Sequence, residues 1–151
     1  MAAGAWKIFG AAEEGINRST IDLDTNTFRM VLVTSAWTPS QTADDTWSDM
    51  SANEVAAGGG YSTHGKLLTC TIARTGLDVF FDCDDQTWTA STITAKYAII
   101  VKDADANAAL AATDLVLCYC DLNDSGGSVS TTSGPLTITI HASGVFKHTV
   151  S

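Results

Sequence analysis

The chain has 151 residues, enough for one domain, and 45% of them are hydrophobic, an ordinary share for a globular protein. Its 8 basic and 17 acidic residues give a formal net charge of −9. This charge argues against direct binding of nucleic acid and against attraction to an anionic membrane, because both depend on clustered lysine and arginine side chains.

The N-terminal segment, residues 1–16, has no strong local pattern and is interpreted as a short helix or an extended arm. Two successive glutamates stand where a signal peptide would continue apolar, and no run in the chain approaches the ~20 apolar residues of a membrane-spanning helix. We therefore expect folding in the cytoplasm. Trp6, Ile8 and Phe9 make this segment a candidate contact with a neighbouring protein.

Strand patterns dominate residues 17–151. Apolar and polar residues alternate in some segments, and in others the apolar run is continuous, as expected for central strands buried on both faces. The predicted strands are 27–34, 67–74, 79–83, 95–102, 115–121, 136–141 and 145–150, with short helices at 51–57 and 104–112. Seven or eight short strands separated by turn residues predict an all-β single domain, a β-sandwich or jelly roll with one or two short helices.

Few side chains form a pattern that could carry chemistry. Asp82, Asp84 and Asp85 are a calcium candidate, because Ca²⁺ prefers several converging oxygen ligands. The segment lacks the glycine and the closing glutamate of an EF-hand loop, so a solvated turn is the preferred interpretation. No metal or cofactor is assigned. The three histidines are scattered and Gly-x-Ser-x-Gly is absent, so no catalytic residue is assigned and an enzyme is not expected.

The four cysteines lack the Cys-x-x-Cys spacing of a zinc site. Cys118 and Cys120 flank one residue, so in a strand they share a face. Cys70 and Cys83 lie in other apolar stretches. We expect all four to be reduced and to serve as small core residues, as is usual in the cytoplasm.

Two segments carry the most specific signal. The first reads TWSDMSANEV at residues 46–55 and GGGYSTHG at 58–65. Ser51 and Glu54 look like a capping pair for one helical turn, which is followed by a glycine turn that lets Tyr61 pack closely. The second segment reads QTWTASTITAKYAIIV at residues 86–101.

These segments resemble small structural proteins of tailed-bacteriophage virions, over residues 28–101 and more loosely to the end of the chain. The resemblance gives weight to Trp47, Glu54, Gly60, Tyr61 and Trp88 as positions that define the fold rather than a site. The sequence departs from the pattern at residue 64, where histidine stands in place of a glycine.

The resemblance implies a capsid decoration or cement protein on the capsid exterior. Such a protein binds across subunits of the major capsid protein and stabilises the icosahedral head, as a homo-oligomer for which three-fold symmetry is one option. Trp37, in a loop before Pro39, joins the N-terminal contact candidates. Two alternatives remain open: a tail, neck or fibre component, and a carbohydrate-binding attachment module, which would need exposed tryptophans.

Overall fold

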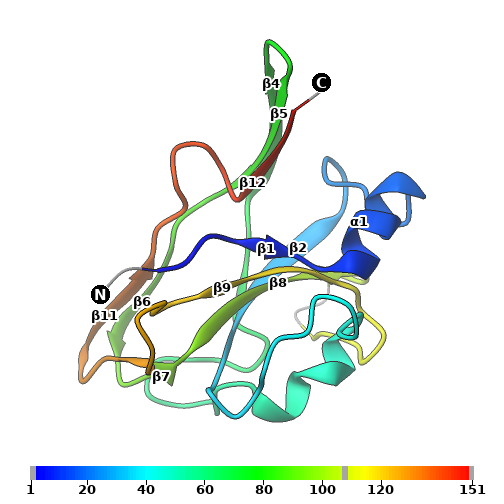
Figure 1. Cartoon of the computed structure of the whole chain (residues 1–151). Coiled ribbons are helices and arrows are strands. Elements are labelled where there is room, and N and C mark those ends of the chain that lie inside the picture. Colours follow the sequence, from blue (N-terminus) through cyan, green and yellow to red (C-terminus); the bar gives the residue numbers. More distant parts are fainter. Residues whose placement is uncertain (1–2, 107–108, 150–151) are drawn as a thin grey trace.

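The computed structural model describes residues 3–106 and 109–149 (Figure 1). It is 41% strand and 10% helix, with several antiparallel sheets, so the prediction of an all-β single domain is confirmed. No helix in the described part of the chain has the length and hydropathy needed to cross a membrane.

A five-stranded antiparallel sheet forms the centre of the molecule, in the order β1-β9-β8-β2-β3. Its strands are β1 (Lys7–Ile8), β9 (Val116–Asp121), β8 (Tyr97–Asp103), β2 (Thr27–Val33) and β3 (Lys66–Leu67). Nearly every residue of β2, β8 and β9 is buried. The continuous apolar runs at 95–102 and 115–121 predicted β8 and β9 as central strands, because a strand covered on both faces gains from an apolar residue at every position. The segment 27–34 was predicted as a strand with one apolar face, and β2 is in fact buried on both faces.

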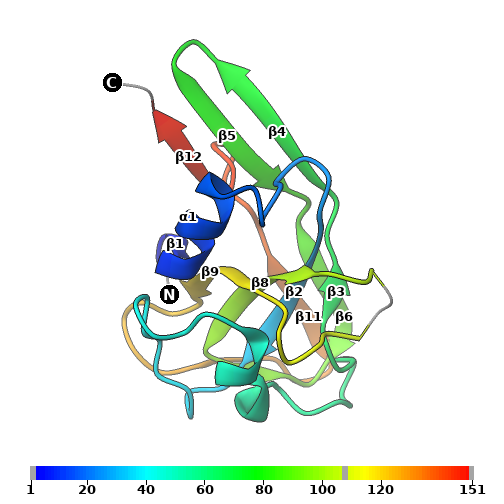
Figure 2. The same ribbon diagram turned by 90° about the vertical axis from the view of Figure 1, so that its right-hand side faces the viewer.

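The remaining strands form smaller antiparallel sheets around this one. They are β4 (Cys70–Thr75), β5 (Asp78–Cys83) and β12 (Phe146–Thr149), in the order β12-β5-β4, then β6 (Gln86–Ser91) with β11 (Gly134–Ile138), and β7 (Thr94–Ala95) with β10 (Val129–Ser130). The rings of Phe28 and Phe81, 5.4 Å apart, join β2 to β5 in the core. The far end of the β4–β5 hairpin projects beyond the body of the molecule (Figures 1 and 2).

The two predicted internal helices are largely wrong. The first is only the 3₁₀ turn η2 (Ser51–Asn53), which follows a second such turn, η1 (Trp47–Asp49). Glu54 is already extended, with ψ 143°, and the capping box is formed instead by Thr46 and Asp49. Residues 104–106 and 109–112 contain no helix. That stretch is rich in alanine but has no apolar stripe to bury, and propensity alone does not stabilise so short a helix.

Of the two forms predicted for the N-terminal segment, a short helix and an extended arm, the described residues contain the short helix. β1 is the edge strand of the central sheet, paired with β9, and the helix α1 (Gly10–Asn17) follows it. Phe9 is 0% exposed and contacts Tyr119, with ring centroids 5.3 Å apart. The expected boundary after residue 16 therefore falls inside α1, because the segment completes the core and does not extend away from it.

Candidate functional site

The two segments that carry the resemblance pack directly against each other. The glycine turn has positive φ at Gly58, Gly59 and Gly60, as predicted, and Tyr61 behind it is buried. Gly59 accepts a hydrogen bond from the Thr92 N–H at 2.7 Å, just after β6 ends. A Cβ on Gly60 would lie 3.2 Å from the Cα of Ser91. The turn needs glycine both for its backbone conformation and for its close approach to β6.

Tyr61 and Glu54 form a polar bridge inside this junction. The Tyr61 hydroxyl donates to the Glu54 carboxylate at 2.8 Å and accepts the buried Leu32 N–H at 3.1 Å. The same carboxylate oxygen accepts the His64 N–H at 2.5 Å. Burial raises the pKa of Tyr61 well above its usual range, so the phenol stays protonated. The bridge holds three chain segments together and is not poised for proton transfer near neutral pH.

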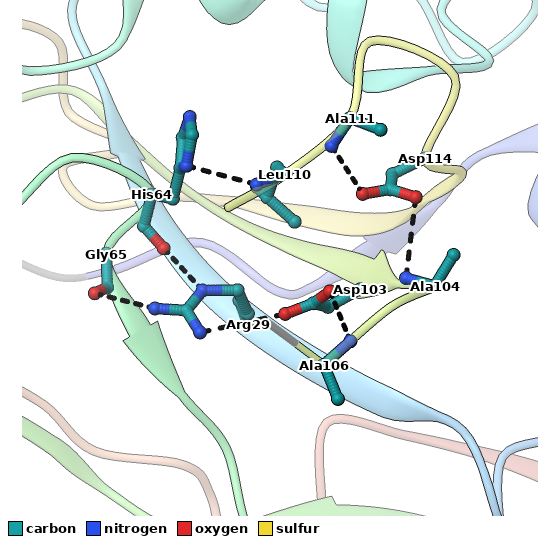
Figure 3. Close-up of polar contacts among 9 residues, drawn as sticks. All are labelled: Arg29, His64, Gly65, Asp103, Ala104, Ala106, Leu110, Ala111 and Asp114. Atoms are coloured by element: carbon teal, nitrogen blue, oxygen red, sulfur yellow. Dashed lines mark hydrogen bonds and ion pairs between the residues drawn. The ribbon is translucent and has the colours of Figure 1, made fainter. Parts of the chain in front are cut away.

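A second polar cluster surrounds Arg29 (Figure 3). Its guanidinium donates to the His64 carbonyl at 2.9 Å and to the Gly65 carbonyl at 3.4 Å, and lies 3.7 Å from the buried Asp103 carboxylate. Asp103 in turn accepts the Ala106 N–H at 2.8 Å. Sequence reasoning missed this pair. The sequence offers only one indication of the pair, a cation and an anion in two largely apolar strands, β2 and β8, which pair with each other in the structure.

The same cluster anchors the loop that follows β8. The His64 Nδ1 accepts the Leu110 N–H at 3.0 Å, and Asp114 accepts the N–H groups of Ala104 and Ala111 (Figure 3). His64 has φ 64°, the left-handed conformation that glycine adopts easily. This explains why the resembled pattern carries glycine there. His64 is half-buried, and its side chain ties the turn to the loop.

A cavity of about 610 Å³ lies between the N-terminal segment and β11. Its walls are mostly apolar and include Trp6, Leu122, Leu136 and Val145, with His141 at one side. The His141 Nδ1 already accepts the Ser143 N–H at 3.0 Å. The volume suits a small ligand, but such sites also present a few converging polar groups that fix its orientation. Few such polar groups line this cavity.

Trp37 and Phe9, predicted as exposed contacts, are core residues. Trp37 is 5% exposed and packs edge-on against Tyr97, with ring centroids 5.1 Å apart. Its loop is held over the sheet, because the Gln41 side chain donates to the Ile8 carbonyl at 2.6 Å. The lack of apolar alternation around Trp37 suggested exposure, but burial here depends on where the loop folds. Trp6 and Ile8 are half-buried.

The calcium candidate is not assembled either. The Asp84 carboxylate accepts the Thr69 N–H at 2.7 Å, and that of Asp85 accepts the Ile140 N–H at 2.8 Å. Asp82 accepts the N–H of the next residue at 2.9 Å. Within residues 3–106 and 109–149, no three acidic, histidine or cysteine side chains form a group that could hold a metal ion. These carboxylates instead satisfy backbone donors between strands.

Two of the three exposed large apolar side chains among the described residues lie on the projecting hairpin, and the third, Leu67, lies on β3. We define the hairpin edge as residues 70–77, which comprise β4 and the two turn residues that follow it. β4 pairs with β5 on one side and is the end strand of its sheet, so its other side is free of a strand partner among the described residues. Ile72 is 40% and Leu77 is 64% exposed. The free side of such an edge strand is a template for association with another chain.

No known protein family, curated protein or solved structure matches this chain.

Proposed function

We propose that this chain is a structural protein of tailed-bacteriophage virions, most simply a capsid decoration protein. It binds across subunits of the major capsid protein as a homo-oligomer and stabilises the head by adhesion. The observation that carries the proposal is the hairpin edge, an exposed edge strand whose outer side has no strand partner among the described residues, on an otherwise well-packed acidic domain. Main-chain pairing to such a strand provides affinity, and the exposed side chains of Ile72 and Leu77 provide apolar contact.

The polar clusters also support a structural role. Glu54, Tyr61, Arg29 and Asp103 are all engaged in holding loops to strands, as described above. The positions to which the resemblance gives weight thus have a common structural explanation, since Trp88 also packs near Tyr61, with ring centroids 6.1 Å apart. A decoration protein needs such rigidity, because it must keep its shape while the shell beneath it is under pressure.

The carbohydrate-binding alternative has less support. It requires tryptophan rings exposed to a sugar, whereas Trp37, Trp47 and Trp88 are buried and Trp6 is half-buried. A tail, neck or fibre component would use the same hairpin edge, and its location on the virion distinguishes it from a decoration protein.

Antibody-gold labelling of intact virions tests the location directly. Gold spread evenly over the heads is expected for a decoration protein, and heads stripped of it should burst more readily. Gold confined to the tail or its tip would refute the decoration role and favour the tail or fibre alternative. No label on any part of the virion would refute the proposal as a whole.

Binding of the purified protein to stripped heads tests the surface. The double variant Ile72→Lys and Leu77→Lys should reduce binding at least tenfold. The matched control is Leu67→Lys, which also replaces an exposed leucine, 55% exposed, on β3 outside the hairpin edge. Equal binding by the double variant and the wild type would show that the hairpin edge is not the docking surface.

A further inference from the structure

Cys70 and Cys83 face each other across the base of the β4–β5 hairpin. The register of the two antiparallel strands pairs them directly. The adjacent pair, Thr69 and Asp84, is joined by a backbone hydrogen bond from the Asp84 N–H to the Thr69 carbonyl at 3.0 Å. Hydrogen-bonded and non-hydrogen-bonded pairs alternate along an antiparallel ladder, so Cys70 and Cys83 form a non-hydrogen-bonded pair.

This position brings the two thiols close together. In a non-hydrogen-bonded pair the Cα atoms are about 4.5 Å apart and the side chains lie on the same face. That separation falls at the short end of the range that a disulfide spans, roughly 4.4–6.8 Å. Both cysteines are free in this structure. Interaction with the Cys70 thiol, followed by burial, raises the pKa of the Cys83 thiol well above its usual range.

The two cysteines differ in access. Cys83 is 7% exposed and faces the core, whereas Cys70 is half-buried at the start of an exposed strand. A small reagent in solution therefore reaches Cys70 first. Cys83 lies behind it, in the position of a resolving thiol.

We infer that Cys70 and Cys83 are an oxidisable dithiol that closes to a disulfide by exchange with a small-molecule disulfide such as oxidised glutathione. The Cys70 thiolate attacks one sulfur of oxidised glutathione and releases the first glutathione thiolate. The Cys83 thiolate then attacks the Cys70 sulfur of the mixed disulfide and releases the second. The protein loses two electrons and two protons, and one glutathione disulfide becomes two glutathione thiols.

The bond would lock the base of the hairpin from which the hairpin edge projects. Because Cys70 is only half-buried, this disulfide would be partly accessible to thiols in solution, and exposed disulfides are more easily reduced than buried ones. Oxidation and reduction would then both be accessible, and the change in hairpin rigidity would be reversible. This inference does not depend on the proposed function, since it concerns the thiol pair alone.

The test is oxidation of the folded full chain in glutathione buffers of graded redox ratio. Samples are quenched with acid, denatured and labelled with a maleimide, and the linked peptides are mapped by mass spectrometry. The expected result is the loss of two of the four thiols, with Cys70 and Cys83 in one linked peptide and full recovery after dithiothreitol. Four labelled thiols at every ratio, or glutathione retained on Cys70, would overturn the inference.

Cys118, which is buried in β9, is the competing partner, since burial, Cys120 and then Cys70 raise the pKa of its thiol. Cys118→Ser should still lose two thiols on oxidation, and Cys70→Ser should lose none. Cys70→Ser is the preferred knockout, because Cys70 is the more exposed partner and its replacement disturbs the core less than that of Cys83. A linked peptide containing Cys118 in the wild type would also overturn the inference.

Discussion

Replacing Tyr61 with phenylalanine isolates the polar bridge between the glycine turn and the central sheet. The substitution keeps the ring and nearly all of its volume, so it opens no cavity. It removes the hydroxyl that accepts the Leu32 N–H at 3.1 Å and donates to Glu54 at 2.8 Å. The effect therefore comes from hydrogen bonding rather than from packing.

Two losses contribute to the expected change. The Leu32 N–H is buried and would have no acceptor, which costs about 1–3 kcal/mol. The hydrogen bond to the charged Glu54 is worth about 1.5–3 kcal/mol, but that carboxylate still accepts the His64 N–H, so only part of this is lost. We expect Tyr61→Phe to lower the free energy of unfolding by about 2–4 kcal/mol, a large share of the ~5–15 kcal/mol typical of a domain.

Urea unfolding followed by tryptophan fluorescence measures this change, and an unaltered m-value shows that the unfolded state is comparable. Tyr97→Phe is the matched control, because the Tyr97 hydroxyl makes no hydrogen bond to a described residue and should cost less than ~0.5 kcal/mol. In a Glu54→Gln background the effect of Tyr61→Phe should shrink by about 1 kcal/mol, as expected for coupled partners. A cost for Tyr61→Phe equal to that of the control would refute the bridge.

Three further predictions concern single positions. Gly65→Ala should abolish folding, because the added Cβ would lie 1.9 Å from a backbone carbonyl oxygen of β2. Gly76 has nearly the same φ, 61° against 58° at Gly65, but the space around its Cβ position is open, so Gly76→Ala is the comparison. The latter should therefore cost only about 1–2 kcal/mol by thermal unfolding, and similar losses would contradict the steric argument. Arg29→Met should lower the free energy of unfolding by about 3–5 kcal/mol, since it leaves the buried Asp103 without its cation. Adding Asp103→Asn should restore part of this stability. A further loss of the same size in the double variant would exclude the pairing. Two backbone N–H groups bonded to Asp49 lower the pKa of its carboxyl, so its stabilising contribution is complete above its ordinary value of 3.8 and is lost as the pH falls further. The stability difference between wild type and Asp49→Asn should accordingly shrink in urea unfolding below that pH, and an unchanged difference would exclude this role.

The fold class and most of the strands could be predicted from the amino-acid sequence alone. Continuous apolar runs indicated β8 and β9, β-rich composition indicated β2, and the glycines before Tyr61 indicated a positive-φ turn. These are local patterns, because periodicity and backbone freedom are properties of neighbouring residues. Strand β6 was not among the strands predicted from periodicity, since its polar residues form a strand by pairing with β11.

The burial of loop residues and the contacts between residues distant in the sequence are seen only in the folded structure. Trp37 is buried because its loop is held over the sheet. Residues 104–106 and 109–112 are not helical, and Asp103 and Asp114 accept backbone N–H groups from them. Arg29 and Asp103 are neighbours only because β2 pairs with β8, and Cys70 meets Cys83 only in the register of one hairpin. Strand register and loop burial depend on long-range pairing, which no local pattern in this chain specifies.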